Sequence, residues 1–333
     1  MAVTSPPRPH GSNASSRGID GGNRPPGIVT DRLFRWVTLA SGLTVLVILG
    51  LIAYSTTKEA WPWFKAEGLG AVLSDDWNPA KNHFGGLALV YGTFLVGVIA
   101  LVIAVPVSMG IALFVTEVAP RPLRKPIVYV VDLLAAIPSV VYGLWAIFVL
   151  LPALTDVFSS VSSATEGIPV LGDLTADPSA TGRSFMAAGI VVAIMIVPIV
   201  TSITREVFTT TPASLKEASY GLGATRWEMI RGSVIPHSRG GVVSAVMIGL
   251  GRAIGETIAV ALVIGSSQRI SEHLFGPGDT MASVIVNEFG EASGTHRAAL
   301  IGLGVVLFAL TVVVGMIARG VVSRIDRRTG ALA

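Results

Sequence analysis

The stretch KEASYGLGATRWEMIRGSVIPHSRGGVVSAVMIGLGRAIGETIAVALVI, residues 216–264, decides how the rest of the chain is interpreted. Its first part is polar, basic and interrupted by glycines. Its second part, Gly240–Ile264, is apolar except for Arg252 and Glu256. About 20 apolar residues in a helix are enough to cross the hydrocarbon core of a bilayer. We therefore expect a polar loop at the membrane surface, followed by a membrane helix that carries two charges.

The composition of the whole chain also indicates a membrane protein. Of 333 residues, 51% are hydrophobic and only 14% are charged, whereas soluble proteins carry about 25% charged residues. The chain has no cysteine and therefore no disulfide framework or thiolate site. Its five histidines are scattered and form no HExxH motif, so no metal site is expected.

Six apolar segments are long enough to span a bilayer, which predicts an all-α integral membrane protein. The second segment contains Pro106, and a proline inside a helix breaks or kinks it. We expect either a bent helix there or a helix followed by a re-entrant piece. The six predicted segments are Trp36–Tyr54, Leu87–Thr116, Ile127–Leu154, Phe185–Thr204, Gly240–Ile264 and Ala298–Ala318.

The distribution of basic residues predicts the orientation of these six segments. With the N-terminus in the cytoplasm, seventeen of the 24 Lys and Arg residues fall on the cytoplasmic side and six on the outer side. Basic residues are retained on the cytoplasmic side of membranes. Both termini are therefore expected in the cytoplasm, and the basic balance requires no nucleic-acid partner.

The segments outside the membrane follow from this topology. Residues 1–30 are rich in Pro, Gly, Ser and Arg and are predicted to form a disordered cytoplasmic tail. Residues 31–325 form the membrane domain, and residues 326–333 form a second cytoplasmic tail. The outer loops, about 55–86, 155–184 and 265–297, are either solvated connections or a face that receives an external protein. Residues Ala282–Phe289 are predicted to form a short surface helix.

The cytoplasmic loop 205–239 is predicted to contain two short helices. Thr211–Pro212 starts the first, since proline is favoured at the first helical position, and Gly221 and Gly223 end it. Residues Thr225–Glu228 (TRWE) have the spacing of a capping box, so a second helix should begin there. It should stop near Gly232, ahead of Pro236.

Two helices separated by glycines have two interpretations. They form a compact knob that transmits movement from a soluble partner to the membrane helices, or they rest on the lipid surface with Trp227 as an interfacial anchor.

The two intramembrane charges lie four residues apart, so in a continuous helix they share one face and can pair. A charge at mid-bilayer costs roughly 2.5–3.5 kcal/mol and normally faces a bundle interior or a wet cavity. One interpretation is an ion pair that joins helices. The other is that Arg252 meets an anionic substrate, with Glu256 positioning it, since a guanidinium matches the oxygens of a phosphate. The small residues Gly249, Gly251 and Gly255 would leave room for a neighbouring backbone or for the ion.

The cytoplasmic loop resembles that of permease subunits of ABC importers, which carry E-A-A, three residues, G, nine residues and I-x-L-P. The matching residues are Glu217, Ala218 and Ser219, then Gly223, then Ser233 to Pro236. Ser219 replaces an alanine, Ser233 an isoleucine and Ile235 a leucine. The resemblance implies that this loop seats in a cleft of a cytoplasmic ATPase.

The sequence GRAIGET, Gly251–Thr257, is similar to a narrower family, the phosphate-specific (Pst-type) importer permeases, and GRAIGETIAV is more like their PstC-type than their PstA-type subunit. Residues Ala136–Gly143 (AIPSVVYG) also resemble that family. The resemblance covers about residues 33–325. It implies the type I permease architecture with six transmembrane helices, a multi-pass location in the bacterial cell membrane, and a substrate pathway at Gly251, Arg252, Gly255, Glu256 and Thr257.

The resemblance also implies the partners. They are a second Pst-type permease, two copies of an ABC ATPase that binds ATP and Mg, an external phosphate-binding protein, and the bilayer. The chain has no GxxxxGK[ST] motif, so it is not expected to be an enzyme or to bind a cofactor itself.

Three alternatives remain open at this point. The first is an ABC importer for sulfate, molybdate or phosphonate, and the second is an ion-coupled secondary transporter or channel. The third is a membrane sensor or scaffold. Asp132, in the third apolar segment, is interpreted as reaching the inner interface or a helix partner rather than the substrate.

Overall fold

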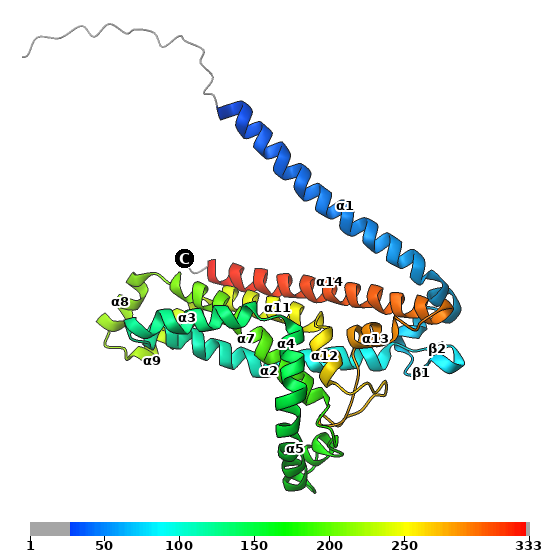
Figure 1. The fold of residues 1–333 in the computed structure, drawn as a ribbon. Coiled ribbons are helices and arrows are strands. Elements are labelled where there is room, and N and C mark those ends of the chain that lie inside the picture. Colours follow the sequence, from blue (N-terminus) through cyan, green and yellow to red (C-terminus); the bar gives the residue numbers. More distant parts are fainter. Residues whose placement is uncertain (1–26, 331–333) are drawn as a thin grey trace, which may run out of the picture. The chain divides into compact units, whose positions relative to one another are not determined.

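The computed structural model describes residues 27–330, which are mainly helical and include one two-stranded sheet. The chain divides after Ile52 into two units, and α1 (Gly27–Glu67) passes through both. The unit that begins at Ala53 contains all the other elements (Figure 1). Of the two predicted tails, residues 1–26 and 331–333 lie outside the described residues, whereas 27–30 belong to α1 and 326–330 to α14 (Gly294–Gly330).

Five helices within residues 27–330 are long and apolar enough to cross a membrane. Four of them cover the predicted first, second, fourth and sixth segments. The helix Ser139–Thr165 overlaps the third predicted segment only in part. The predicted fifth segment, Gly240–Ile264, is interrupted. The five are Thr30–Glu67 in α1, Leu87–Val118 in α2 (Leu87–Leu113) and the π-helical turn η3 (Phe114–Val118), Ser139–Thr165, Phe185–Thr209 in α7 (Phe185–Thr209), and Gly294–Arg324 in α14.

The prediction of a single helix over Ile127–Leu154 is wrong. The structure places its first half in α3 (Arg121–Ala136), which ends before Pro138. Ile137 is extended, because a residue that precedes proline is disfavoured in the helical region. Pro138 then caps α4 (Ser139–Trp145). Asp132 therefore lies on α3, and its side chain is exposed.

Helix α4 continues through the π-helical turn η4 (Ala146–Leu150) into α5 (Leu151–Thr165). In Figure 1, α4 and α5 run across the direction of α2, α7 and α14. By contrast, α2 runs through Pro106 without interruption, so the predicted re-entrant piece is absent from residues 87–118.

The connections between the long helices contain short elements. On the outer side these are η1 (Leu69–Leu73), the hairpin of β1 (Trp77–Asn78) and β2 (His83–Phe84), η2 (Pro79–Lys81), α6 (Leu171–Thr175) and α13 (Met281–Glu288). The cytoplasmic loop holds α8 (Ala213–Gly221), α9 (Arg226–Met229), the π-helical turn η5 (Ile230–Val234) and α10 (Ile235–His237). It leads into α11 (Arg239–Ile254) and α12 (Ile258–Val263).

Three buried apolar clusters hold the second unit together. The middle cluster packs α2, α7 and α12 around Phe185 and Ile196. The outer cluster joins the end of α1, the hairpin, α13 and α14, and in it Trp63 Nε1 donates a hydrogen bond to the carbonyl of Phe84 at 3.1 Å. The inner cluster packs the cytoplasmic loop against the ends of α2 and α7, with Phe208 at its centre. The cytoplasmic loop is therefore packed onto two of the spanning helices.

Candidate functional site

The fifth apolar segment is divided into two helices at the residues that the sequence singles out. Helix α11 ends at Ile254, and α12 begins at Ile258. The amide of Gly255 closes α11 by donating to the carbonyl of Gly251 at 3.3 Å, whereas the amide of Ala261 in α12 donates to Thr257 at 2.9 Å. Interrupted helices in membrane proteins occur where the backbone lines a cavity or is covered by protein. Residues 255–257 are therefore the candidate site.

The predicted pairing of Arg252 with Glu256 does not form. It assumed one continuous helix, and the break after Ile254 removes the one-turn geometry that would bring the two side chains together. Glu256 instead accepts a hydrogen bond at 3.4 Å from the amide of Ala259, at the start of α12. The Arg252 side chain is exposed, and within residues 27–330 its guanidinium makes no hydrogen bond or ion pair.

An open groove runs beside this break. It has a volume of about 570 Å³ and is bordered by Gly251 and Ile254 on α11 and by Thr311, Gly315 and Arg319 on α14. A Cβ atom added at Gly251 would meet nothing within 4 Å, and one added at Gly255 would meet only carbonyl oxygens of its own turn. These glycines therefore face free space in the isolated chain, and no neighbouring backbone packs on them.

Thr257 lies in the break as well. Its hydroxyl donates to the carbonyl of Gly255 at 3.1 Å, which fixes the turn between the two helices.

The segment Ala136–Gly143 supports the second half of the broken helix. Helix α4 packs on α12, and a Cβ at Gly143 would lie 2.7 Å from Cδ1 of Leu262 and 3.1 Å from Cα of Ala259. Only a glycine allows the two helices to approach this closely. The two sequence segments that resemble one family are thus in contact, although more than 100 residues separate them.

Most of the local structure predicted for the cytoplasmic loop 205–239 is confirmed. Thr225 caps α9 and forms the predicted capping box with Glu228, and the hydrogen bonds from the backbone and side chain of Thr225 lower the pKa of that carboxyl. Helix α8 ends at Gly221, and Gly223 has a φ of +83°, a conformation that favours glycine. We call residues 205–239 the docking loop from here on.

The predicted end of the second helix near Gly232 is wrong. The chain passes through the π-helical turn η5 and enters α10 with Pro236 in its first turn. A proline in a first turn removes no hydrogen bond that the helix needs. Pro236 therefore continues the helical path.

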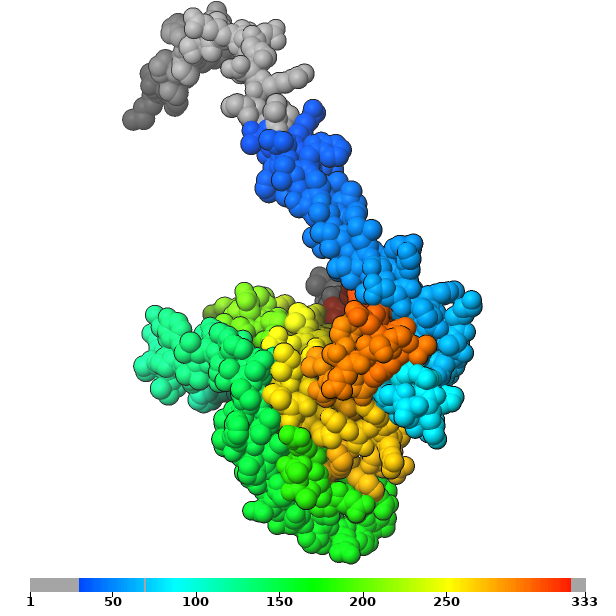
Figure 2. Space-filling model, turned by 45° about the vertical axis from the view of Figure 1, so that its right-hand side comes forward, coloured from blue at the N-terminus to red at the C-terminus, as the bar shows by residue number. Residues whose placement is uncertain are grey.

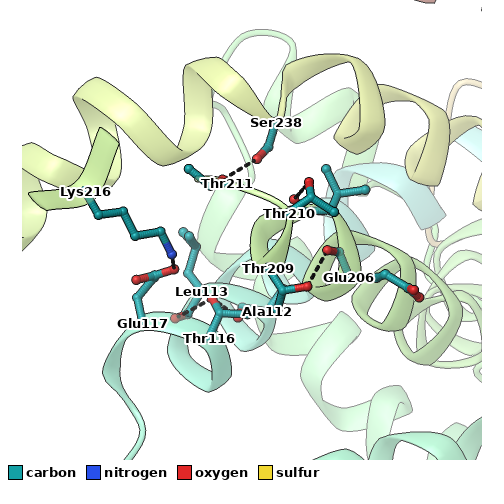
Figure 3. A network of polar contacts seen from close by, with 11 residues as sticks. Ala112, Leu113, Thr116, Glu117, Glu206, Thr209, Thr210, Thr211, Lys216 and Ser238 are labelled. Carbon is teal, nitrogen blue, oxygen red and sulfur yellow. Dashed lines mark hydrogen bonds and ion pairs between the residues drawn. The ribbon is translucent and has the colours of Figure 1, made fainter. Parts of the chain in front are cut away.

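The docking loop is fixed to the membrane helices by polar contacts as well as by the inner apolar cluster (Figure 3). Lys216 Nζ lies 2.6 Å from Oε1 of Glu117, at the end of the second span, and the Glu117 side chain is only 8% exposed. At the base of the loop, the hydroxyls of Thr211 and Ser238 are 3.4 Å apart. The loop is therefore tied to α2 through one charged contact and closed at its own base.

The two serines that depart from the importer pattern contact each other. The hydroxyls of Ser219 on α8 and Ser233 in η5 lie 2.7 Å apart. If only one of these positions were serine and the other kept the alanine or isoleucine of the pattern, the single hydroxyl would need a different hydrogen-bond partner. The paired departures instead join the two halves of the docking loop.

The outward face of the docking loop carries exposed apolar and acidic side chains. Leu222 is 90% exposed and Trp227 is 61% exposed. Glu217 and Ala218 are also exposed, whereas Ser219 is half-buried. A mixed surface of this kind, on a base that is itself well packed, is suited to bind another protein.

The outer loops form a packed cap, which sequence reasoning did not detect. The predicted surface helix exists as α13, but its first half, Met281–Val284, is buried. Asp279 precedes it and is 2% exposed; its carboxylate accepts hydrogen bonds from the amide of Thr280 at 3.0 Å and from the Ser283 hydroxyl. Burial raises the pKa of Asp279 to about 6 despite these bonds.

Glu288, at the end of α13, links several outer segments. Its carboxylate accepts hydrogen bonds from Trp77 Nε1 at 3.2 Å and from Gln268 Nε2 at 2.6 Å, and it lies 2.8 Å from Nε2 of His296. Glu288 therefore ties the first and third outer connections together.

A family model described as "Binding-protein-dependent transport system inner membrane component" matches residues 104–330. The chain belongs to this family. As an inner membrane component it is a multi-pass membrane protein of the cell membrane, and its fold is the six-span permease architecture with the fifth span interrupted.

Curated relatives of this inner membrane component share one name. The chain is 47% identical over 305 residues to the "Phosphate transport system permease protein PstC" of Mesorhizobium japonicum, which covers 91% of this chain and 93% of that protein. It is 40% identical over 303 residues to the protein of that name in Pasteurella multocida, with 91% and 94% covered. It is also 33% identical over 291 residues to a "Probable phosphate transport system permease protein PstC" of Methanocaldococcus jannaschii, with 85% and 91% covered.

A solved structure shares the fold. A chain of the "bacterial alginate ABC transporter in complex with alginate pentasaccharide-bound periplasmic protein" superposes with a TM-score of 0.61 at 16% sequence identity, and 90% of this chain and 98% of that chain are covered.

Proposed function

We propose that this chain is the transmembrane permease subunit of an ATP-driven importer that carries inorganic phosphate into the cytoplasm. One observation supports the proposal above all others. The only charged side chains predicted within the fifth span lie where that span is broken, and Arg252 is exposed and without an acidic partner among the described residues. A guanidinium in this state can bind the oxygens of an anion through two parallel hydrogen bonds.

Glu256 has a different role in this proposal from the one predicted for it. Its carboxylate accepts from the first turn of α12, so it fixes the angle between the two half-helices. Gly251, Gly255 and Thr257 shape the space beside the guanidinium. In this arrangement the substrate meets a single positive charge next to a break in the helix, where backbone groups outside the regular helical pattern lie beside it.

A second permease completes the pathway in the proposal. The groove between α11 and α14 has one open side, and an exposed arginine inside a bilayer would be costly if lipid covered it. Arg252 does not line this groove itself but directly follows Gly251, which does, so a partner permease placed over this part of α11 would cover Arg252 as well. The relatives' names support phosphate as the cargo.

The ATPase is a separate chain in this proposal, and it supplies the ATP and Mg. The docking loop, with Glu217, Ala218 and Gly223 on its exposed part and Pro236 in its last helix, would seat in one copy of the ATPase. The partner permease would engage a second copy. An external binding protein would deliver phosphate to the outer cap.

Transport then follows from the contacts of the docking loop. ATP-driven closure of the ATPase pair moves the two docking loops together, and the contact of Lys216 with Glu117 and the inner apolar cluster carry this movement to α2 and α7. Because α11 packs on α7, the break at residues 255–257 changes its surroundings, and Arg252 is exposed alternately to each side.

The test is phosphate uptake by the reconstituted complex. Uptake should require ATP on the side of the membrane that carries the docking loop and the binding protein on the opposite side. Excess sulfate should not compete with phosphate. Arg252→Ala should abolish uptake while the complex still assembles. Arg252→Lys should retain part of it, since an ammonium keeps the charge but loses the two-pronged contact. Arg35→Ala, which removes an exposed arginine from α1 to which the proposal gives no role, is the matched control and should transport normally.

Three results would contradict the proposal. Normal uptake by Arg252→Ala would remove this residue from the pathway. Uptake driven by an ion gradient without ATP would identify a secondary transporter. Equal competition by sulfate or molybdate would identify a different oxyanion as the cargo.

A further inference from the structure

An apolar groove lies between the cytoplasmic end of α2 and helix α3, away from the candidate site. It has a volume of about 520 Å³. All of its lining residues are apolar or glycine, and on α3 they run from residue 126 to residue 134, about 12 Å along the helix. The lining residues are Gly110, Ile111, Phe114, Pro126, Ile127, Val130, Val131 and Leu134.

The start of α3 places positive charge at the cytoplasmic end of this groove. Arg121, Arg124 and Lys125 occupy its first turns and are all exposed. Arg124 Nε donates to the carbonyl of Ala119 at 2.9 Å, which anchors the side chain and leaves the outer nitrogens of its guanidinium available. None of the three cations forms an ion pair within residues 27–330, and the nearby acid Glu117 is taken by Lys216.

The flank of α3 beside the groove is apolar and exposed. Tyr129 is 65% exposed, Val130 56% and Leu133 68%. In Figure 2 the teal-green region around the connection of α2 to α3 projects at the left of the surface. An exposed apolar flank that ends in a basic turn is the surface pattern of a helix in contact with the inner leaflet.

We propose that this groove binds one phospholipid with an anionic headgroup from the inner leaflet. The acyl chain lies along Ile111, Phe114 and Ile127, and the headgroup phosphate contacts the basic turn of α3. Charge complementarity favours this occupant, because the cytoplasmic leaflet is the anionic one and basic pockets at the ends of spanning helices bind acidic headgroups. A second protein chain would match the apolar groove only if it also brought acidic side chains to these three cations, whereas an anionic phospholipid carries both parts in one molecule.

The lipid site adjoins the docking loop without being part of it. Phe114, which lines the groove, begins the π-helical turn η3, and Glu117 lies in the same turn. A bound lipid therefore packs against the turn that carries the acid of the Lys216 contact.

The experiment measures which lipids the assembled complex retains. Phosphatidylglycerol and phosphatidylcholine are titrated in turn into the delipidated complex, and bound lipids are counted by native mass spectrometry. The wild type should bind one phosphatidylglycerol more tightly than any phosphatidylcholine. The triple variant Arg121→Gln, Arg124→Gln, Lys125→Gln should weaken that site by a factor on the order of a hundred, since each charge contributes roughly fivefold.

Two further variants make the test specific. Val130→Trp keeps all three charges but fills the groove from an exposed position, and it should lower retention of the same lipid. The control variant Lys58→Gln, Lys65→Gln, Lys81→Gln removes three exposed cations from the outer side and should retain the lipid as the wild type does.

Three outcomes would overturn the proposal. The first is equal retention of both lipids by the wild type. The second is an equal loss in the control variant, which would indicate non-specific attraction. The third is a cross-link from position 130 to the partner permease in the assembled complex, which would assign the groove to a protein contact.

Discussion

The contact between Lys216 and Glu117 determines how firmly the docking loop is held to the second span. The two charged atoms lie 2.6 Å apart, and the side chains are 24% and 8% exposed. Removing one partner of a fully buried pair costs about 3–5 kcal/mol. A hydrogen bond between charged groups contributes about 1.5–3 kcal/mol. Because the Lys216 side chain reaches solvent, we expect Lys216→Met to destabilise the attachment of α8 by about 2 kcal/mol.

Amide hydrogen exchange of the purified chain measures this attachment directly. A loss of about 2 kcal/mol corresponds to roughly thirtyfold faster exchange of the amides in α8, with little change in α14. Glu117→Gln should act on the same amides. The double variant should be little worse than the more severe single variant, because both remove one contact. Unchanged protection of α8 in Lys216→Met, or fully additive effects in the double variant, would refute this account of how the loop is held.

Three further predictions concern other parts of the chain. The pKa of Asp279 is raised to about 6 in the folded protein from an ordinary value of 3.8, so the folded state binds a proton more readily and this residue favours folding more as pH falls through about 6. The stability of wild type relative to Asp279→Asn should therefore rise by about 1.4 kcal/mol from about pH 7.5 to about pH 5, measured by unfolding in detergent; a constant difference would contradict it. Gly223→Ala should weaken co-purification with the ATPase, because alanine at a φ of +83° costs roughly 1–2 kcal/mol of backbone strain. Gly223→Asn should weaken co-purification less. Equal binding by the wild type and both variants would show that the turn is not needed. Gly143→Ala should destabilise the chain by about 1–3 kcal/mol, because the new Cβ would lie 2.7 Å from Cδ1 of Leu262. The control Gly304→Ala, whose Cβ would meet nothing within 4 Å, should unfold like the wild type. Identical unfolding of the two variants would count against close packing of α4 on α12.

The features that sequence predicted well depend on neighbouring residues. The capping box of Thr225 and Glu228 needs only its own four residues, and the end of α8 at Gly221 follows from the glycines at that point of the chain. The spanning segments Leu87–Val118 and Phe185–Thr209 follow from apolar runs that are longer than any core helix requires.

The features that sequence missed depend on contacts between distant parts of the chain. Glu117 follows a long apolar run and looks like an ordinary boundary residue until its contact with Lys216, 99 residues later, is seen. The hydroxyl pair of Ser219 and Ser233 likewise turns two separate departures from a pattern into one contact.

The break in the fifth span shows a different limit of sequence reasoning. The spacing of Arg252 and Glu256 predicts pairing only if the helix is continuous, and Gly251 and Gly255 gave the only local sign that it is not. Gly143 on α4, which packs against α12, is part of what supports the broken geometry. Such a geometry follows from tertiary packing and could not be read from the segment alone.

The central claim is that phosphate meets the guanidinium of Arg252 within the membrane. A structure of the assembled complex with phosphate trapped during turnover tests it most directly. We expect phosphate within hydrogen-bond distance of Arg252, beside the break at residues 255–257 and enclosed by the partner permease. An Arg252 side chain that faces lipid, or a phosphate bound elsewhere along the path, would contradict it.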